Sequence, residues 1–303
     1  MTVSIRRSFI IVGCFAALSC NSPRFEARWQ LTTFRVMGVR VTPADVTPGD
    51  HVTLELATAD IRPRPVSVLW LACLGGYQMT DVDAGPEGTG PGVRGCRDAL
   101  TLGSGPSIAL DLPADLGGIA RAASIPVVGF ACAGGTIARG TGDAPWPDCV
   151  GEGAEGWPFI RRVRLRPVRA TTPPNHNPRI SEVALIANGQ HTVLDLQLTH
   201  VIAPCESGCG PYQVAIRFAP GSQESYADPA VTGGRRFEQL NTGFFIDTGS
   251  LATAFIPTGM GEAEPVIVNT WRPPSRPKTA HLFVYTTDGR DGFDWTSRTI
   301  QVQ

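Results

Sequence analysis

Apolar and polar residues alternate in short segments along most of the chain, and this period of two predicts β-strands. In the segment 51–57, for example, Val52, Leu54 and Leu56 fall on one face of an extended chain. The segments are rich in β-branched residues and end at Gly, Pro, Asp or Asn, whereas helical patterns are scarce. We therefore predict an all-β fold built from antiparallel sandwiches. The expected strands span residues 34–42, 51–57, 66–73, 107–112, 125–132, 159–168, 180–186, 191–198, 212–218, 243–247, 265–271, 279–286 and 293–302.

A proline-rich segment separates these strands into two groups. Residues 170–178, with the sequence ATTPPNHNP, cannot continue a sheet interior and favour stiff polyproline II geometry. We interpret them as a linker between a first domain, 28–169, and a second domain, 179–303. Two domains also suit the length of the chain.

Two sequence matches between the groups predict that the domains are copies of one fold. The segment 191–198 (HTVLDLQL) aligns with the strand around Leu54 and Leu56 at an offset of 140 residues. Near the end of the second group, Trp295 aligns with Trp157 at an offset of 138 residues. Because the offsets nearly agree at both ends of the domain, we expect tandem copies rather than two unrelated sandwiches.

Residues 1–19 have the parts of an export signal. An arginine pair precedes the apolar run Phe9–Leu18, which is shorter than the roughly 20 residues that a membrane-spanning helix needs. Small residues follow, and Cys20 is the candidate for lipidation. The same small residues also satisfy ordinary signal cleavage, and the arginine pair approaches the twin-arginine pattern. We favour general export of a lipoprotein, with residues 20–27 as a tether.

Cysteine parity supports a modified Cys20. Six cysteines follow it, enough for three disulfides, and an unmodified Cys20 would be an odd thiol of a kind that secreted proteins usually avoid. An exported chain also reaches an oxidising compartment, where disulfides are the expected state. We therefore expect a membrane-anchored lipoprotein of the cell envelope on the extracytoplasmic side, with the outer membrane or the cell surface favoured.

Charge and motifs argue against several kinds of chemistry. The formal net charge of −1 gives no reason to expect a nucleic-acid partner, which calls for a basic surface. The histidines lack metalloprotease spacing, and no Gly-x-Ser-x-Gly elbow is present. Residues 151–156 (GEGAEG) match the dinucleotide fingerprint by letter, but neighbouring prolines indicate a loop without a helix. We expect no cofactor, although such motifs do not reveal carboxylates that meet only in the folded chain.

Two polar segments carry a calcium hypothesis. Asp288, Asp291 and Asp294 lie in a glycine-rich hairpin, and the linker contains Asn175-His176-Asn177. Calcium takes 6–8 oxygen ligands, whereas Arg290 lies inside the hairpin and the linker has no carboxylate. An ordinary Asp-Gly turn is the preferred interpretation, with the three aspartates as the alternative calcium ligands.

Two stretches resemble immunoglobulin-like modules of bacterial envelope proteins. The segment 47–54 (TPGDHVTL) is similar to the Pro-Gly-Asp-x-Val-Thr-Leu lead into a second strand of those modules, and 288–302 is similar to their closing hairpin. In layout, the mature chain resembles bacterial envelope lipoproteins with tandem immunoglobulin-like domains. The resemblance implies two such sandwiches and an envelope location, and it implies no chemistry.

An immunoglobulin-like arrangement sets the expectation for the cysteines. The strands that end at Cys73 and Cys132 would be antiparallel neighbours, so these cysteines would lie at opposite ends of the domain, farther apart than the roughly 7 Å that a bridge allows. Each has a nearer partner across a glycine-rich loop. Redox enzymes favour two residues between their cysteines, whereas three residues separate Cys205 from Cys209. We therefore prefer structural disulfides to redox chemistry. We predict Cys73–Cys96, Cys132–Cys149 and Cys205–Cys209.

The function expected from these observations is non-enzymatic. Loops 74–95 and 133–148 are longer than hairpins require, and rigid sandwiches commonly present such loops for interaction or adhesion with an envelope protein or glycan. Trp146 and Trp271, near loops, would suit recognition if exposed and would otherwise cover the ends of the sandwiches. The alternatives are a secreted hydrolase or glycan-processing enzyme with carboxylates at the domain interface, and a passive surface spacer.

Overall fold

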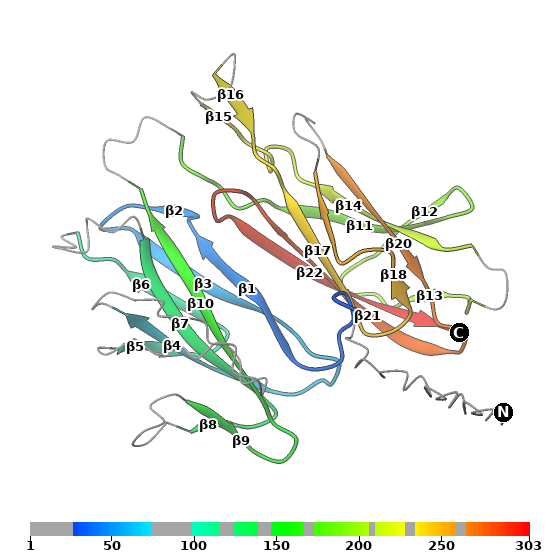
Figure 1. Ribbon diagram of the computed structural model, residues 1–303, viewed down its shortest axis with the longest axis horizontal. Coiled ribbons are helices and arrows are strands. Elements are labelled where there is room, and N and C mark those ends of the chain that lie inside the picture. The colour runs from blue at the N-terminus through cyan, green and yellow to red at the C-terminus, as the bar shows by residue number, and fades with distance from the viewer. Residues whose placement is uncertain are drawn as a thin grey trace, which may run out of the picture.

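A computed structural model describes residues 27–73, 99–114, 124–138, 147–166, 173–205, 210–227, 234–258 and 265–303. These residues form strands, turns and loops, and the strands build two sandwiches that lie side by side (Figure 1). This part of the chain contains no apolar helix of membrane-spanning length. The predicted all-β fold is confirmed. The expected signal segment and Cys20 lie outside the described residues.

The first sandwich consists of a three-stranded sheet, β1-β3-β6, and a five-stranded sheet, β2-β10-β7-β4-β5. A separate two-stranded sheet is formed by β8 and β9. The strands are β1 (Arg35–Thr42), β2 (Asp45–Val46), β3 (His51–Ala59), β4 (Val66–Cys73), β5 (Ala99–Ser104), β6 (Ser107–Asp111), β7 (Ser124–Ala133), β8 (Thr136–Ala138), β9 (Asp148–Val150) and β10 (Glu155–Leu165).

The second sandwich consists of two five-stranded sheets, β12-β11-β14-β20-β18 and β13-β22-β21-β17-β19, with a two-stranded sheet β15-β16. The strands are β11 (Ile180–Ala187), β12 (Gln190–Val193), β13 (His200–Ile202), β14 (Tyr212–Phe218), β15 (Ser225–Ala227), β16 (Arg235–Phe237), β17 (Asn241–Ile246), β18 (Ser250–Leu251), β19 (Phe255–Pro257), β20 (Val266–Arg272), β21 (Lys278–Thr287) and β22 (Phe293–Val302).

The strand order of both sandwiches is that of an immunoglobulin-like fold. In that fold, strands A, B and E share one sheet, and C, F and G share the other. The first sandwich matches with β1-β3-β6 as A-B-E and β10-β7-β4 as G-F-C. The second matches with β11-β14-β20 and β22-β21-β17 in the same places. Each sandwich also has a short strand, β2 or β13, that pairs in parallel with strand G.

The cores follow the period of two that the sequence shows. Val52 and Leu54 of β3 are fully buried, and β3 enters from a turn in which the Asp50 N–H donates to the Thr47 carbonyl over 3.0 Å. Gly49, the third residue of that turn, has φ +93°, a positive value that the same position of a type II turn requires. The buried Trp70 on β4, the position of the usual strand-C tryptophan, donates from its indole nitrogen to the Gly105 carbonyl over 2.7 Å.

One predicted strand, 191–198, is wrong beyond its first residues. β12 is a short edge strand that ends at Val193, and Leu196 is 69% exposed. The counterpart of β3 in the second sandwich is β14, so the offset of 140 does not mark equivalent strands. The other match holds in position, because Trp157 and Trp295 are each the third residue of a strand G. The alternating leucines 194, 196 and 198 resemble a strand, but they lie where the chain crosses from the sheet of β12 to the sheet of β13.

The start of the described chain packs on the second sandwich before it enters the first. The Leu31 N–H donates to the Ile246 carbonyl, and the Ile246 N–H donates to the Trp29 carbonyl, both over 2.9 Å. Trp29 packs against the core of the second sandwich, whereas Phe34 belongs to the core of the first. The first residues of the predicted first domain therefore attach to strand β17 of the second.

Candidate functional site

The disulfide Cys132–Cys149 fixes a small hairpin to one end of the first sandwich. The bridge joins β7 to β9 with an S–S distance of 2.03 Å and a Cα–Cα distance of 5.2 Å, as predicted. Within the hairpin, Ile137 of β8 pairs with Cys149 of β9. We call β8 and β9 the clamped hairpin, and it lies beside the end of β7 and the start of β4 (Figure 1).

Glycines allow the clamped hairpin to lie close against the sandwich. Gly156 of β10 is opposite Cys132 on β7, and a Cβ at Gly156 would lie 2.9 Å from the Cys149 Cβ. A Cβ at Gly135 would lie 2.7 Å from the Val150 carbonyl oxygen. Residues 151–156 form a turn and the start of β10, so the expected loop is confirmed in place of a dinucleotide site.

A network of charged side chains around Glu155 lies at the same end of the first sandwich as the clamped hairpin. The Glu155 carboxylate accepts hydrogen bonds from the Phe34 N–H over 2.7 Å, from Arg64 over 3.1 Å and from Arg62. Burial raises the pKa of Glu155, but these three donors outweigh it and the net pKa is lowered. Arg64 also donates to the Gly153 carbonyl over 2.8 Å, which ties the turn beside the clamped hairpin to the loop before β4.

Each of the other two predicted disulfides has one cysteine outside the described residues. Cys73 is the last residue of β4, and Cys96 lies outside the described residues. Cys205 is disulfide-bonded, and its predicted partner Cys209 also lies outside them. Because β4 and β7 are antiparallel, Cys73 at the end of β4 and the clamped hairpin after β7 lie at opposite ends of the sandwich.

The two sandwiches meet at a polar junction. We define the junction cluster as Asn175, Glu224, Glu238, Asp288 and Arg290. Arg290 lies at its centre and forms ion pairs with Glu224 and Glu238 through two guanidinium nitrogens. The Asn175 side-chain N–H groups donate to Asp288 over 3.1 Å and to the Arg290 carbonyl over 3.0 Å. The guanidinium also lies 5.3 Å from the ring centre of Tyr226.

The linker is built into this junction. The Asn175 N–H donates to Asp45 of the first sandwich over 2.9 Å, and the Asn177 side chain donates to the Val41 carbonyl over 2.8 Å. The Asn177 side-chain oxygen accepts from the Phe293 N–H of the second sandwich over 3.0 Å. The predicted linker is therefore a bridge with side chains bonded to both domains.

Arginines of the first sandwich reach across to the closing hairpin of the second. Arg40 forms an ion pair with Asp294 at 2.9 Å, and its guanidinium lies 4.6 Å from the Trp295 ring centre. Arg161 donates to the Asp291 carbonyl. Together with the linker contacts, these bonds join the sandwiches along a continuous seam.

Asp288 and Asp294, two of the three alternative calcium ligands, accept hydrogen bonds from protein donors. Asp288 accepts from the N–H groups of Arg290 and Gly292, each over 2.7 Å, and Asp294 accepts from Arg40 and from the Ile180 N–H. Asp291 is exposed, and the described residues hold no group of His, Cys, Asp and Glu side chains that could bind a metal. The structure does bring hairpin and linker together, but the guanidinium of Arg290 supplies the positive charge. The Asp-Gly turn interpretation is confirmed.

Glu238 makes the junction sensitive to pH. Burial, reinforced by Asp288, raises its pKa from 4.5 to about 7 against the opposing effect of Arg290. Because the folded state then binds the proton more tightly than the unfolded state, we expect stability to rise as the pH falls from above 7 towards 4.5, by about 3 kcal/mol. Urea unfolding at about pH 5 and about pH 8 measures this. The variant Glu238→Gln should lose most of this increase, and an unchanged pH profile in the variant would show that another group titrates.

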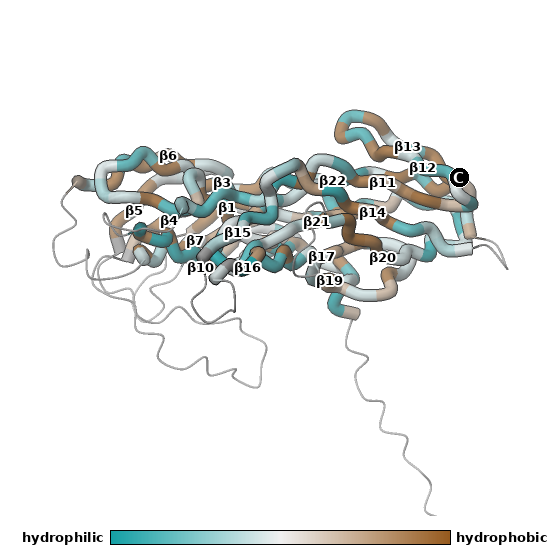
Figure 2. The backbone as a smooth tube through the Cα atoms, turned by 90° about the horizontal axis from the view of Figure 1, so that it is seen from above, coloured by the Kyte–Doolittle hydropathy of each residue, from teal (hydrophilic) through white to brown (hydrophobic). Residues whose placement is uncertain are grey.

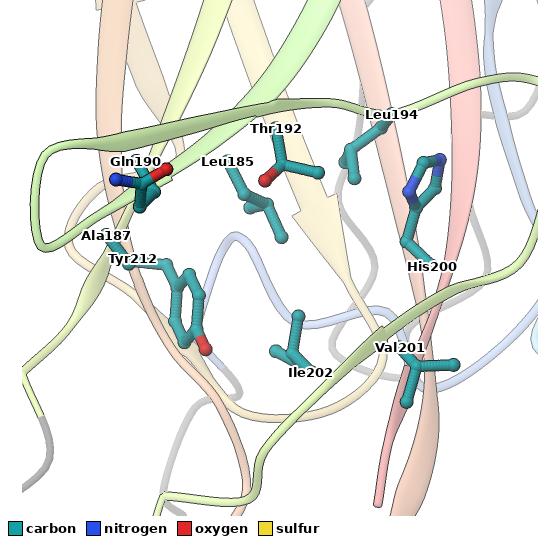
Figure 3. Close-up of a pocket in the computed structure, with 9 residues that line it drawn as sticks. All are labelled: Leu185, Ala187, Gln190, Thr192, Leu194, His200, Val201, Ile202 and Tyr212. Atoms are coloured by element: carbon teal, nitrogen blue, oxygen red, sulfur yellow. The ribbon is translucent and has the colours of Figure 1, made fainter.

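A small pocket opens at the far edge of the second sandwich, between β12 and β13. Its volume is about 250 Å³, below the roughly 300 Å³ of the smallest sites for drug-sized ligands. Five of its nine lining residues are apolar, and the polar ones are Gln190, Thr192, His200 and Tyr212 (Figure 3). The His200 Nε2 atom accepts from the Asp195 N–H over 2.6 Å, which fixes the crossing segment beside it. The sequence analysis did not predict this pocket, because it treated 191–198 as one continuous strand.

The two tryptophans considered for recognition have different outcomes. Trp271 lies on β20 and is fully buried in the second core, where its indole N–H donates to the Thr248 carbonyl over 3.3 Å. It therefore fills the sandwich and is not available to a ligand. Trp146 lies outside the described residues.

No protein-family model matches the sequence, and no curated protein matches it. Red sea bream transglutaminase is similar over 90% of this chain and 32% of its own, at 12% identity and a TM-score of 0.27. Alpha-2-macroglobulin of E. coli is similar over 92% of this chain and 17% of its own, at 11% identity and a TM-score of 0.25. A marsupial T cell receptor is similar over 90% of this chain and 100% of its own, at 11% identity and a TM-score of 0.20.

The chain spans about a third or less of the length of the transglutaminase and of the alpha-2-macroglobulin. TM-scores of this size carry no argument, and the fold assignment rests on the strand order.

Proposed function

We propose that this protein is a non-enzymatic, lipid-anchored protein of the cell envelope that presents the clamped hairpin for interaction or adhesion. The observation that carries the proposal is the disulfide Cys132–Cys149, which fixes both strands of the hairpin to the end of β7. A loop held at its base loses less conformational entropy when it binds a partner, and this favours recognition. An envelope protein or glycan is the proposed partner.

The seam between the sandwiches supports the same proposal. Arg40, Asn175 and Asn177 each bond to groups in the opposite sandwich or to both sandwiches. This seam holds the clamped hairpin in a fixed position relative to Trp29–Leu31, which lead to the proposed anchor at Cys20. The function proposed is therefore that of a tethered, rigid presenter.

The junction carboxylates give a hydrolase or glycan-processing enzyme as the second candidate. Glu238 is 1% exposed and Asp288 is 6% exposed, and both are bonded to protein donors. Their burial favours a structural role over substrate contact. Turnover of a glycan or peptide substrate that a single change, Glu224→Gln, abolishes would establish the enzyme instead.

Replacing residues 139–146 with a Gly-Ser segment of equal length tests the presenting role. We expect saturable binding of the fluorescent, anchor-free protein to lipid-extracted envelope preparations to weaken by about tenfold or more, because recognition groups are removed while the base of the hairpin stays clamped. As a matched control, Asn188→Ser alters an exposed hairpin turn of the second sandwich and should leave binding unchanged. Equal binding by the loop variant and the native chain would refute presentation by the clamped hairpin.

A further inference from the structure

Four large apolar side chains are exposed together at the edge of the second sandwich. Val193 is 49% exposed, Leu196 69%, Leu198 62% and Val201 60%. Single exposed apolar residues are ordinary, but a contiguous group usually marks an interaction surface. We call these four residues the apolar edge. Figure 2 shows the segment around β12 and β13 standing out from the sandwich beside the C-terminus, with apolar positions along it.

The apolar edge is held in a defined shape. The Asp195 carboxylate accepts from the Gln197 N–H over 2.7 Å, and the Asp195 N–H donates to His200 over 2.6 Å. Arg298 donates to the Leu194 carbonyl over 2.5 Å, and Leu194 is buried. The leucines at 196 and 198 therefore point away from the core because the backbone of this crossing is fixed, and the folded chain offers them no cover.

The proposed anchor lies within reach of this edge. Seven residue steps separate Cys20 from Ala27, where the described chain begins, and they span at most about 25 Å. Trp29–Leu31 are bonded to Ile246 of β17, so the tether leaves from the second sandwich. A bilayer that holds acylated Cys20 is therefore within about 25 Å of the second sandwich.

The sheet order gives the distance from that point to the apolar edge. Strands β17, β21, β22 and β13 are consecutive, so three steps of about 4.8 Å lead across the sheet, about 14 Å in all. The pairing places Ile246 level with Arg298 of β22 and Ile202 level with Val302 of the same strand. The distance along β22 from Arg298 to Val302 is about 13 Å. The combined separation of about 20 Å is shorter than the extended tether.

Positive charge borders the same end of the sandwich. Lys278 pairs with Val302, which is itself level with Ile202 of β13, and Arg276 precedes it in an exposed loop. Lysine and arginine near a bilayer surface are attracted to anionic headgroups, and exposed leucines enter the boundary with the acyl chains. Asp195, between Val193 and Leu196, is exposed and acidic, and its carboxylate accepts from the Gln197 N–H.

We infer that the second sandwich lies on the bilayer to which the chain is tethered, with the apolar edge inserted at the lipid–water boundary. The inference rests on the lipid anchor of the proposed function. The bilayer is the occupant because the short tether holds this sandwich at the membrane. In Figure 1 the clamped hairpin and the strands β12 and β13 lie at opposite sides of the molecule, so this orientation directs the hairpin away from the lipid.

Sedimentation with vesicles tests the inference without the anchor. The mature chain carrying Cys20→Ser is mixed with vesicles of phosphatidylethanolamine and phosphatidylglycerol. We expect measurable binding, and we expect the double change Leu196→Asp and Leu198→Asp to lower the partition coefficient by about tenfold or more, because two apolar side chains no longer leave water. Leu100→Asp, at a leucine 53% exposed on the first sandwich, is the matched control and should bind like the parent chain.

Three results would overturn the inference. They are failure of the parent chain to bind vesicles, equal binding by the double variant, and concentration-dependent dimerisation that the double variant abolishes in the absence of lipid. Mass spectrometry of the mature N-terminal peptide tests the anchor separately. Vesicle binding by a chain whose Cys20 is unmodified would support membrane contact by the apolar edge and refute the lipid anchor. An acylated Cys20 without vesicle binding by the apolar edge would support the anchor and refute the membrane contact.

Discussion

Above pH 7, where Glu238 is ionised in the native chain, the change Arg290→Met is expected to destabilise the protein by about 3–5 kcal/mol, because removing one partner of a buried ion pair leaves the other charge uncompensated. Arg290 is paired with Glu224 and Glu238, and the Glu238 side chain has 0% of its surface exposed. Methionine keeps much of the side-chain volume, so the expected loss comes from charge and hydrogen bonds rather than from a cavity. Loss of the guanidinium also removes the contact with Tyr226.

Chemical denaturation followed by tryptophan fluorescence and circular dichroism measures this effect. Arg276→Met, at an exposed arginine of the same sandwich, serves as the control and should change stability by less than about 0.5 kcal/mol. Adding Glu238→Gln to Arg290→Met should restore part of the loss, since the stranded carboxylate becomes neutral. If Arg290→Met is as stable as the native chain, the ion pairs of Arg290 with Glu224 and Glu238 do not stabilise the fold.

Paired substitution of Cys132 and Cys149 by serine is expected to lower the free energy of unfolding by about 3 kcal/mol. The bridge closes a loop with a sequence separation of 17 residues, and its loss returns that freedom to the unfolded chain. In the folded state, the clamped hairpin would keep its contacts at Gly135 and Gly156 but lose its covalent attachment.

Thermal and chemical denaturation of the serine variant, compared with the native chain, give the magnitude. Hydrogen exchange of β8 and β9 shows whether the hairpin loosens before the sandwich does, and we expect faster exchange there. The pair Cys205 and Cys209, replaced in the same way, is the control. It would close a much shorter loop, so its removal should cost less. A larger loss from the control pair would contradict the loop-closure explanation.

Local patterns were sufficient to predict most of the sandwich strands. Alternation in 51–57 marked the strand that spans His51–Ala59, and a turn with Gly49 at positive φ leads into it. These features depend on contacts between near neighbours and on the conformations that single residues allow. The disulfide Cys132–Cys149 was also predictable, because antiparallel pairing of β4 and β7 keeps Cys73 and Cys132 apart.

The same local patterns failed where a segment changes sheets. Leu194, Leu196 and Leu198 alternate like a strand, yet only the first is buried, because the chain crosses from β12 to β13 there. Short edge strands such as β18 and β19 were missed, since two or three residues carry too little pattern. Neither error affects the strand order of the two sandwiches.

The sequence by itself determined the all-β class, the separation into two groups of strands and the turn chemistry, because these follow from residue periodicity and backbone preference. Only the tertiary structure decided that Asn175 and Asp288 meet around Arg290, and that Trp29–Leu31 attach to the second sandwich. These contacts join residues more than 100 positions apart in the chain. The polar residues that make them carry no periodic signal, so their partners are fixed only when the packed sandwiches bring the segments together.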